Sequence, residues 1–430
     1  MRILVVSNLY PPLHIGGYEL CCKEAVDGLR ERGHEVFVLT SSYGVDKNED
    51  KTDANAGIYR WLEIDLGPGG THFGGRLTGL LERTIGLAKK EIHNFRAFRR
   101  GVKRFRPDVI YLWNLTHISV SIGLQARNMG FPTCYYIGDL WLTKWRNDSW
   151  LSAGAGTFLP PRHRLVYLAP RLARAALRLS GIDRAGSLDL RHVQFASGYL
   201  KNEALKAGEP VEDAEVLYWG IELEKHSFKP DAGLPRRMLC VGQVVPHKGL
   251  DTALEALEAL VREQGCASLK LSIVGGSIYP DYVSALREKV RSLGLEKNVN
   301  FMGEVPREDL PSIYREHDLF LFPSLIDEGL GLSILEAMAS GLLVLGTASG
   351  GSSEVLIHDQ TGLVFPKGDA ATCAALVLRA LNDFSLFERI RRGGRKLVEE
   401  RFEMGRLMEN LERSLHSALN SRCDRPRPNG

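Results

Sequence analysis

Short apolar runs alternate with stretches of helical periodicity along the whole chain, and this alternation most constrains the fold. The runs have the length of buried strands and lie at Ile3–Val6, Val36–Thr40, Val109–Leu112, Thr133–Ile137, Val193–Ala196, Met238–Val241, Leu269–Val274, Val299–Met302, Leu319–Phe322 and Leu343–Gly346. Helical patterns lie between them at Leu20–Arg32, Asp251–Glu263, Tyr282–Leu293 and Gly331–Ser340. Continuously apolar strands alternating with helices indicate parallel sheets covered on both faces. The sequence therefore predicts an α/β fold with two doubly wound, Rossmann-like domains.

Turn and breaker residues between Gly208 and Pro235 indicate the domain boundary. We place an N-terminal domain at 1–213 and a C-terminal domain at 214–402, and expect a helix near 403–419 to complete the first domain. The polar, Pro-containing tail at 421–430 is expected to be disordered. Ligands of doubly wound sheets bind outside the carboxyl ends of the strands. The predicted ligand site therefore lies in the cleft between the two domains.

Composition and charge exclude several classes of protein. A formal net charge of +3 is too small to indicate a nucleic-acid partner. The seven cysteines are odd in number and form no Cys-x-x-Cys pair, which argues against a disulfide framework or a zinc site. The first residues read as a buried strand and a turn, not a signal peptide, and no apolar run approaches the ~18 residues of a membrane span. We expect a cytoplasmic protein, either free or peripheral at the inner face of the membrane.

The segment from Glu328 to Gly341, EGLGLSILEAMASG, carries the strongest functional signal. It follows a predicted strand and opens a helix, where glycines let backbone amides approach a phosphate and the helix dipole favours its charge. Glu328 precedes the helix and Glu336 lies on it, so the two carboxylates can accept hydroxyls on either side of a diphosphate. The alternative is an ordinary helix start with an acidic first turn. That alternative explains the glycines and Glu328 but not Glu336.

Two further strand-to-helix loops are candidate binding loops. Lys248, in VGQVVPHKG, can neutralise a phosphate as a point charge, although a lone loop lysine is more often solvated. Gly16 and Gly17 permit close backbone approach after the first strand, or form a plain turn before a helix. Neither loop is a Gly-x-Gly-x-x-Gly fingerprint, which argues against a dehydrogenase.

These motifs resemble the large family of retaining glycosyltransferases called family 4. The likeness covers most of the chain: PP…GG…E after the first strand, LRERGHEV, VGQVVPHKG, EGLGLSILEAMASG, and GGSSEVL followed by TGLVF. The order and spacing of the motifs together are specific. The resemblance implies the GT-B fold, two Rossmann-like domains facing each other across a cleft. It also implies a retaining transferase that moves a hexose-type sugar from a nucleotide-diphosphate sugar to a hydroxyl on a glycan, a lipid-linked molecule or a small molecule.

The resemblance also assigns roles to residues. The donor-binding set would be Gly16, Gly17, Gln243, Lys248, Glu328, Leu330, Gly331, Leu332 and Glu336. Within it, Lys248 would bind the diphosphate, Glu328 the transferred sugar and Glu336 the ribose. Such enzymes use cations and a helix terminus in place of a metal, and this chain contains no Asp-x-Asp. We therefore expect no metal and no cofactor.

The chain departs from the family pattern at two positions. Gln243 stands where the family usually has Arg, so one diphosphate cation is missing. Gly138 stands where the family often has a His, directly before Asp139. Asp139, His117 and Asn114 are the candidates to fill that place, and we take Asp139, with Lys248 and Glu328, as catalytic. A nucleotide-sugar epimerase or phosphorylase on the same fold, or a non-catalytic relative that binds nucleotide sugars, remain alternatives.

Basic residues concentrate in two N-terminal stretches, at Lys89–Arg106 and Arg162–Arg191. An Arg-rich amphipathic helix can lie on anionic lipid, which would suit a lipid-linked acceptor. The more common alternative is a solvated helix face. A peripheral membrane contact is therefore a second hypothesis for a partner, after the nucleotide sugar and the hydroxyl acceptor.

Overall fold

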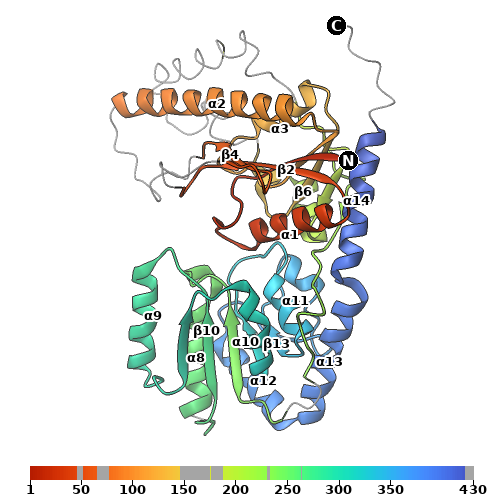
Figure 1. The fold of residues 1–430 in the computed structure, drawn as a ribbon. Coiled ribbons are helices and arrows are strands. Elements are labelled where there is room, and N and C mark those ends of the chain that lie inside the picture. Colours follow the sequence, from red (N-terminus) through yellow and green to blue (C-terminus); the bar gives the residue numbers. More distant parts are fainter. Residues whose placement is uncertain are drawn as a thin grey trace. The chain divides into compact units, whose positions relative to one another are not determined.

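The computed structural model describes residues 1–45, 52–64, 77–145, 175, 187–229, 233–262 and 264–421. The chain divides into two compact units. The N-terminal unit comprises Met1–Ala196, Leu200–Leu217 and Met408–Gly430, and the C-terminal unit comprises Ser197–Tyr199 and Tyr218–Leu407. Each unit is an α/β structure built on its own largely parallel sheet, as predicted (Figure 1).

The sheet of the N-terminal unit has the strand order β3-β4-β2-β1-β5-β6-β7-β8. Its strands are β1 (Arg2–Val6), β2 (Glu35–Ser41), β3 (Thr52–Asp53), β4 (Ile58–Leu62), β5 (Val109–Leu112), β6 (Thr133–Ile137), β7 (Val193–Phe195) and β8 (Glu215–Val216). All pairings are parallel except that of β3 with β4. The central strands β1 and β5 are almost fully buried, which explains why their sequences are continuously apolar.

Helices cover both faces of this sheet. They are α1 (Gly17–Glu31), α2 (Leu77–Phe105), α3 (Ser121–Asn128), α4 (Trp141–Lys144), α7 (Gly198–Lys206) and α14 (Met404–Asn420). Figure 1 shows α2 and α3 on one face and α1 on the other. A Cβ on Gly28 of α1 would lie 2.7 Å from the Met408 side chain of α14. Glycine at this position therefore lets α14 pack closely against α1.

The sheet of the C-terminal unit has the order β11-β10-β9-β12-β13-β14 and is parallel throughout. Its strands are β9 (Arg237–Val241), β10 (Lys270–Val274), β11 (Val299–Gly303), β12 (Leu319–Phe322), β13 (Leu343–Gly346) and β14 (Leu363–Val364). Its helices are α8 (Leu250–Arg262), α9 (Pro280–Ser292), α10 (Leu310–Glu316), α11 (Leu332–Ala339), α12 (Ala370–Asn382) and α13 (Phe384–Arg401), with short 3-10 turns at Pro246–Lys248, Arg307–Asp309 and Gly351–Glu354.

Alternate residues of these strands enter two separate cores. Leu319 and Leu321 of β12 pack with α8, α9 and α12, whereas Phe320 and Phe322 pack with α10 and α11. Because successive side chains of a strand point to opposite faces, a strand buried on both faces must be apolar at every position.

The sequence analysis did not predict strands β3, β4, β8 and β14, and other predicted segments stay untested. The longest of these four strands is β4 at Ile58–Leu62, which pairs with β2. Residues 146–161, most of Arg162–Arg191 and the tail from 422 lie outside the described residues. No single helix in the described part of the chain is long and apolar enough to span a membrane, although α12 and α13, which meet at a sharp bend, pass that test as a pair.

Candidate active site

Three loops meet at the carboxyl edge of the C-terminal sheet because they follow neighbouring strands. They connect β9 to α8, β12 to α11, and β13 to the 3-10 turn at Gly351–Glu354. Backbone hydrogen bonds join them: the Leu325 amide donates to the His247 carbonyl (2.8 Å), and the Gly351 amide to the Glu328 carbonyl (2.7 Å). The three segments singled out from the sequence therefore form one continuous surface.

Two motif glycines permit this close approach. Gly249 has φ of 68°, and a Cβ at its position would lie 2.0 Å from the Pro323 carbonyl oxygen. A Cβ on Gly351 would lie 1.8 Å from the carbonyl oxygen of Gly329. No side chain fits at such distances, so glycine at these two positions allows the loops to contact one another closely.

Lys248 and Glu328 form the charged centre of this surface. The Lys248 Nζ lies 2.8 Å from Glu328 Oε1, and the Ser324 hydroxyl donates to the same oxygen at 2.6 Å. Within the described part of the chain, the second oxygen of Glu328, Oε2, accepts no hydrogen bond. The arrangement leaves one carboxylate oxygen free for a ligand hydroxyl and places an ammonium group beside it.

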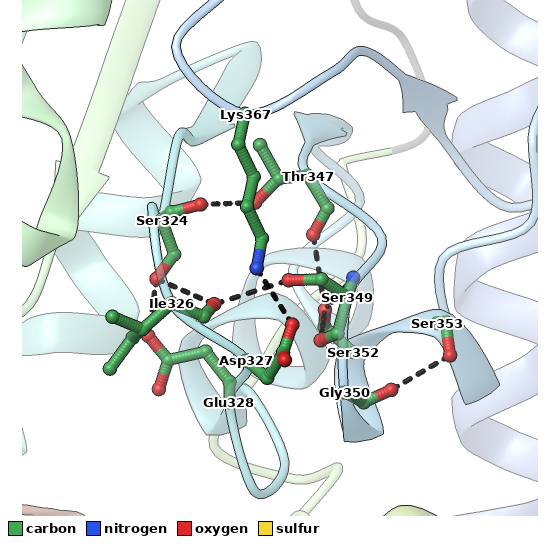
Figure 2. Close-up of polar contacts among 10 residues, drawn as sticks. All are labelled: Ser324, Ile326, Asp327, Glu328, Thr347, Ser349, Gly350, Ser352, Ser353 and Lys367. Carbon is green, nitrogen blue, oxygen red and sulfur yellow. Dashed lines mark hydrogen bonds and ion pairs between the residues drawn. The ribbon is translucent and has the colours of Figure 1, made fainter.

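Hydroxyl groups hold the loop that carries Glu328 (Figure 2). Thr347 Oγ1 donates to the Ser324 carbonyl (2.7 Å) and Ser349 Oγ to the Ile326 carbonyl (3.1 Å), so the β13 loop supports the β12 loop. At the outer side, Lys367 Nζ pairs with Asp327 at 2.7 Å, and the hydrogen bond from Lys367 holds the pKa of Asp327 below its ordinary value. The position of Glu328 is therefore set before any ligand binds.

Glu336 is buried on α11 and has two partners. The Tyr314 hydroxyl donates to Oε2 at 2.8 Å, and the guanidinium of Arg307 lies 3.4 Å from Oε1. Burial, and then the neighbouring Glu336 carboxylate, raise the pKa of Tyr314 well above its ordinary value, so its hydroxyl keeps the proton that it donates. Sequence reasoning missed both partners, because Arg307 and Tyr314 belong to no motif and approach Glu336 only through the fold.

The start of α11 lies directly after the Glu328 loop. Gly331 is the residue before the first helical residue, Leu332, and Leu330 precedes it. The amides at this point have no carbonyl partner within the helix, and they carry the positive end of its dipole. Gln243 lies half-buried in the Lys248 loop, where its carbonyl accepts the Val245 amide at 3.1 Å.

The two glycines of the N-terminal unit differ in their bonding. The Gly16 amide donates to Glu19 Oε2 at 3.0 Å, so in this structure a carboxylate of the first turn of α1 already occupies it. Gly17 begins α1, and its amide belongs to the first turn, where no helical carbonyl is available.

Asp139 follows β6, next to the loop that follows β5. The Trp141 amide donates to its Oδ1 at 2.8 Å, and Asn114 Nδ2 lies 3.4 Å from its Oδ2. The pKa of Asp139 is raised to about 6, mainly by burial and also by Glu19, although the Trp141 amide and Lys144 act to lower it. Among the candidates for this place, Asn114 thus contacts Asp139.

His117, the third candidate, is exposed in the β5–α3 loop, with φ of 68°. Its carbonyl accepts a hydrogen bond from Lys90 of α2 at 3.1 Å, and Asn94 of α2 donates to the next carbonyl, that of Ile118, at 2.7 Å. Buried polar groups of α2 therefore hold this strained loop in place. Among the described residues, no cluster of three or more His, Cys, Asp or Glu side chains could hold a metal ion.

Solved structures with a similar fold include a sucrose-phosphate synthase and a glycosyltransferase. Sucrose-phosphate synthase from Thermosynechococcus elongatus superposes with a TM-score of 0.71 at 19% identity, over 97% of this chain and 99% of that one. WaaG, a glycosyltransferase of lipopolysaccharide biosynthesis, superposes with a TM-score of 0.63 at 19% identity, over 96% of this chain and 99% of that one. The two parallel-sheet units thus have the GT-B fold.

Sequence comparisons identify the family. Residues 16–193 match the glycosyl transferase 4-like domain, and residues 224–397 match the glycosyl transferases group 1. The chain therefore belongs to the family-4-like glycosyltransferases, as its motifs predicted.

The chain is also similar to individual glycosyltransferases. It is 34% identical to an amylovoran biosynthesis glycosyltransferase of Erwinia amylovora, over 42% of this chain and 44% of that one. It is 30% identical to a GDP-mannose-dependent alpha-(1-6)-phosphatidylinositol monomannoside mannosyltransferase of Mycobacterium tuberculosis, over 51% of this chain and 60% of that one. An uncharacterised glycosyltransferase of Methanocaldococcus jannaschii is 25% identical over 94% of both chains. The first two alignments thus span less than two thirds of those relatives.

Proposed function

We propose that this protein transfers a hexose-type sugar from a nucleotide-diphosphate sugar to a hydroxyl acceptor, with retention at the anomeric carbon and without a metal. The observation that carries the proposal is the convergence of Lys248 and Ser324 on one oxygen of Glu328, beside the start of α11. A carboxylate oxygen for sugar hydroxyls and cationic groups for a diphosphate thus lie side by side. Structures of Anabaena HepE, whose fold is similar (TM-score 0.65), contain UDP, which supports a nucleotide donor.

Each part of the nucleotide-sugar donor is bound by residues of matching chemistry. Lys248 and the amides of Leu330, Gly331 and Leu332 bind the diphosphate, and Glu328 binds hydroxyls of the sugar. Glu336 binds the ribose hydroxyls, and Gln243 adds a neutral side chain to the same loop. The amide of Gly17, with that of Gly16 once it is released from Glu19, binds the donor phosphate from the N-terminal unit.

In the proposed reaction the acceptor hydroxyl attacks the anomeric carbon on the face from which the nucleotide diphosphate leaves. The new bond joins the acceptor oxygen to the anomeric carbon as the bond from that carbon to the diphosphate oxygen breaks. The hydroxyl proton passes to an oxygen of the departing diphosphate. Lys248 and the α11 amides stabilise the charge that develops there, so they perform the role of a metal ion. Asp139 accepts a hydrogen bond from the acceptor hydroxyl and orients it.

A thermal-shift panel of nucleotide sugars and free nucleotides, with EDTA present, tests the donor site. A ligand that binds only the folded state at a hundred times its Kd stabilises it by about 2.7 kcal/mol. We expect one base to raise the melting temperature and expect the shift to be lost in Glu336→Gln, which keeps the shape of the side chain. The control Glu258→Gln changes a partly buried carboxylate on α8, paired with Arg262, and should keep the shift.

The alternatives predict different outcomes in the same assays. A non-catalytic relative would bind the nucleotide but transfer sugar to no acceptor. A phosphorylase would require inorganic phosphate for turnover, and an epimerase would convert the donor without an acceptor. A shift that requires a divalent cation would contradict the metal-free proposal, and no shift with any nucleotide would contradict the donor site.

We also propose that α2 contacts an anionic membrane surface. Seven exposed cations lie on it or just after it, and none forms an ion pair with a described acidic residue: Lys89, Arg96, Arg99, Arg100, Lys103, Arg104 and Arg106. Arg99, Arg100 and Arg104 lie over the rings of Phe95, Trp61 and Tyr59. Cations near an anionic lipid surface favour binding by roughly 1 kcal/mol each. A lipid-linked acceptor would be presented at such a surface.

Vesicle co-sedimentation checks the membrane contact. We expect the protein to pellet with phosphatidylserine-containing vesicles at low salt, but not at high salt or with pure phosphatidylcholine. The double variant Arg96→Glu/Lys103→Glu should stay in the supernatant. The control Lys206→Glu/Lys396→Glu makes the same charge change at two other exposed positions and should pellet normally. Equal losses in both double variants, or no pelleting at low salt, would contradict the proposal.

A further inference from the structure

Residue 138 is a glycine because a side chain at this position would collide with a neighbouring residue. Its φ does not lie in the left-handed region, so its backbone conformation is open to other residues. A Cβ at this position would, however, lie 2.8 Å from Cδ2 and 2.9 Å from Cε2 of the Tyr18 ring. The first side-chain carbon of any other residue would therefore overlap this ring.

The Tyr18 ring is fixed and cannot easily yield. Its hydroxyl donates to the Tyr136 carbonyl, and its ring centroid lies 5.7 Å from that of Trp113 and 6.4 Å from that of Tyr136. Trp113 and Tyr136 are themselves stacked at 4.7 Å and fully buried. An aromatic ring held by a hydrogen bond and two neighbouring rings has few alternative rotamers, so a side chain at residue 138 would have to displace this cluster.

The same ring lies beside Asp139, the next residue along the chain. Gly138, the residue before Asp139, lies against the Tyr18 ring, and the carboxyl group of Asp139 raises the pKa of Tyr18, after burial. The groups that face Asp139 are Tyr18 and Glu19 from α1, Asn114 from the β5 loop, and the Trp141 amide and Lys144 from α4. Of these groups, the Tyr18 ring presents an apolar face, and burial is the main cause that raises the pKa of Asp139.

We propose that Tyr18 and Gly138 form a matched pair that positions Asp139: the ring fills the space above the glycine and fixes the carboxylate for an acceptor hydroxyl. The proposal rests on the proposed function, because Asp139 is there the group that contacts the acceptor. Tyr18 itself is a positioning residue that acts through Asp139. The acceptor site of this chain is thus built from an aromatic ring on α1 and a carboxylate after β6.

A double-mutant cycle tests the pair. Gly138→Ala and Tyr18→Ala should each lower turnover with saturating donor at least about tenfold, because each disturbs Asp139. In the double variant the Cβ no longer meets a ring, so Gly138→Ala should cost little beyond Tyr18→Ala. Tyr18→Phe keeps the ring and should stay within severalfold of the wild type. Gly86→Ala, a glycine of α2 with open space around it, is the control for the glycine change.

The pH profile separates positioning from general structural damage. In the wild type, turnover should fall as the pH drops through about 6, because the protonated Asp139 carboxyl no longer offers a charged oxygen to the hydrogen bond that orients the acceptor hydroxyl. In Tyr18→Ala, water reaches the carboxylate, its pKa falls toward the ordinary value, and the acid limb should move down by about one pH unit or more. Additive losses in the cycle, or an unmoved acid limb, would overturn the proposal.

Two measurements keep this test separate from the proposed function. The nucleotide thermal shift reports the donor site and should persist in every variant of the cycle, which also shows that the protein is folded. If Asp139→Asn leaves turnover unchanged, the acceptor role of Asp139 is wrong and this inference falls with it, while the donor assignment stands. If the shift itself is absent from the wild type, the proposed function fails first.

Discussion

Replacing Lys248 by alanine is expected to lower kcat by roughly a hundred- to a thousandfold, while the protein stays folded. Lys248 contributes the one side-chain cation that lies within hydrogen-bond distance of Glu328 among the described residues, 2.8 Å from its Oε1. As the nucleotide diphosphate leaves, negative charge grows beside this ammonium group, so its removal raises the barrier more than it weakens donor binding. Steady-state kinetics with a defined acceptor measures this effect as a fall in kcat larger than any rise in KM.

The ion pair between Lys367 and Asp327 provides a matched control (Figure 2). Lys367 follows β14, is more exposed than Lys248, and is paired at 2.7 Å with the residue before Glu328, so Lys367→Ala removes an equal charge from beside the Glu328 loop. We expect this variant to keep kcat within severalfold. Lys248→Arg keeps the charge and should recover part of the loss. A similar fall in kcat for both alanine variants would mean that loop order, and not charge at Lys248, limits turnover.

The strands of both units were predictable because burial on two faces requires apolar residues at successive positions. Leu319–Phe322 illustrates this, since its side chains enter one core and the other in turn. The segment Ile58–Leu62 was not recognised, because β4 lies near the sheet edge and Arg60 and Trp61 are only partly buried. A strand with one half-exposed face carries a weaker signal than a central strand.

The charged residues of the donor site were predictable, but their supporting contacts were not. Glu328, Glu336 and Lys248 stand in glycine-containing loops whose place between a strand and a helix is readable from sequence. Ser324 and Tyr314 fix the two carboxylates, yet a serine or a tyrosine at these positions is ordinary in a sequence. Their roles depend on which strands are neighbours in the sheet, and the sequence pattern does not specify this order.

The structural reasons for two glycines could not be predicted from the sequence. Gly249 follows Lys248 in a predicted binding loop, and the structure adds that this glycine lets the loop approach the Pro323 carbonyl. Gly138 was treated as the loss of a family histidine, yet the space at that position is filled by the Tyr18 ring. In both cases a residue distant in sequence explains the glycine, so the explanation required the fold.

Gly249→Ala is expected to reduce the free energy of unfolding by roughly 4 kcal/mol or more and to abolish the nucleotide thermal shift. The left-handed φ of 68° costs an alanine about 1–2 kcal/mol, and the Cβ must in addition move the Pro323 carbonyl from 2.0 Å to a normal contact distance. Moving Pro323 disturbs the loop that runs on to Ser324, whose hydroxyl holds Glu328. Urea unfolding of the full chain, followed by tryptophan fluorescence with and without nucleotide, measures both effects.

Gly265→Ala separates the two contributions. Gly265 has the same φ of 68°, but a Cβ there meets nothing within 4 Å. This control therefore introduces the backbone strain without the collision, and it should cost only about 1–2 kcal/mol and leave the nucleotide shift intact. The difference between the two variants is the energetic cost of separating the loops that carry Lys248 and Glu328. If Gly249→Ala and Gly265→Ala destabilise the protein equally, the close approach at Pro323 does not hold the donor site together. Gly249 would then be needed only for the left-handed backbone conformation of its own turn.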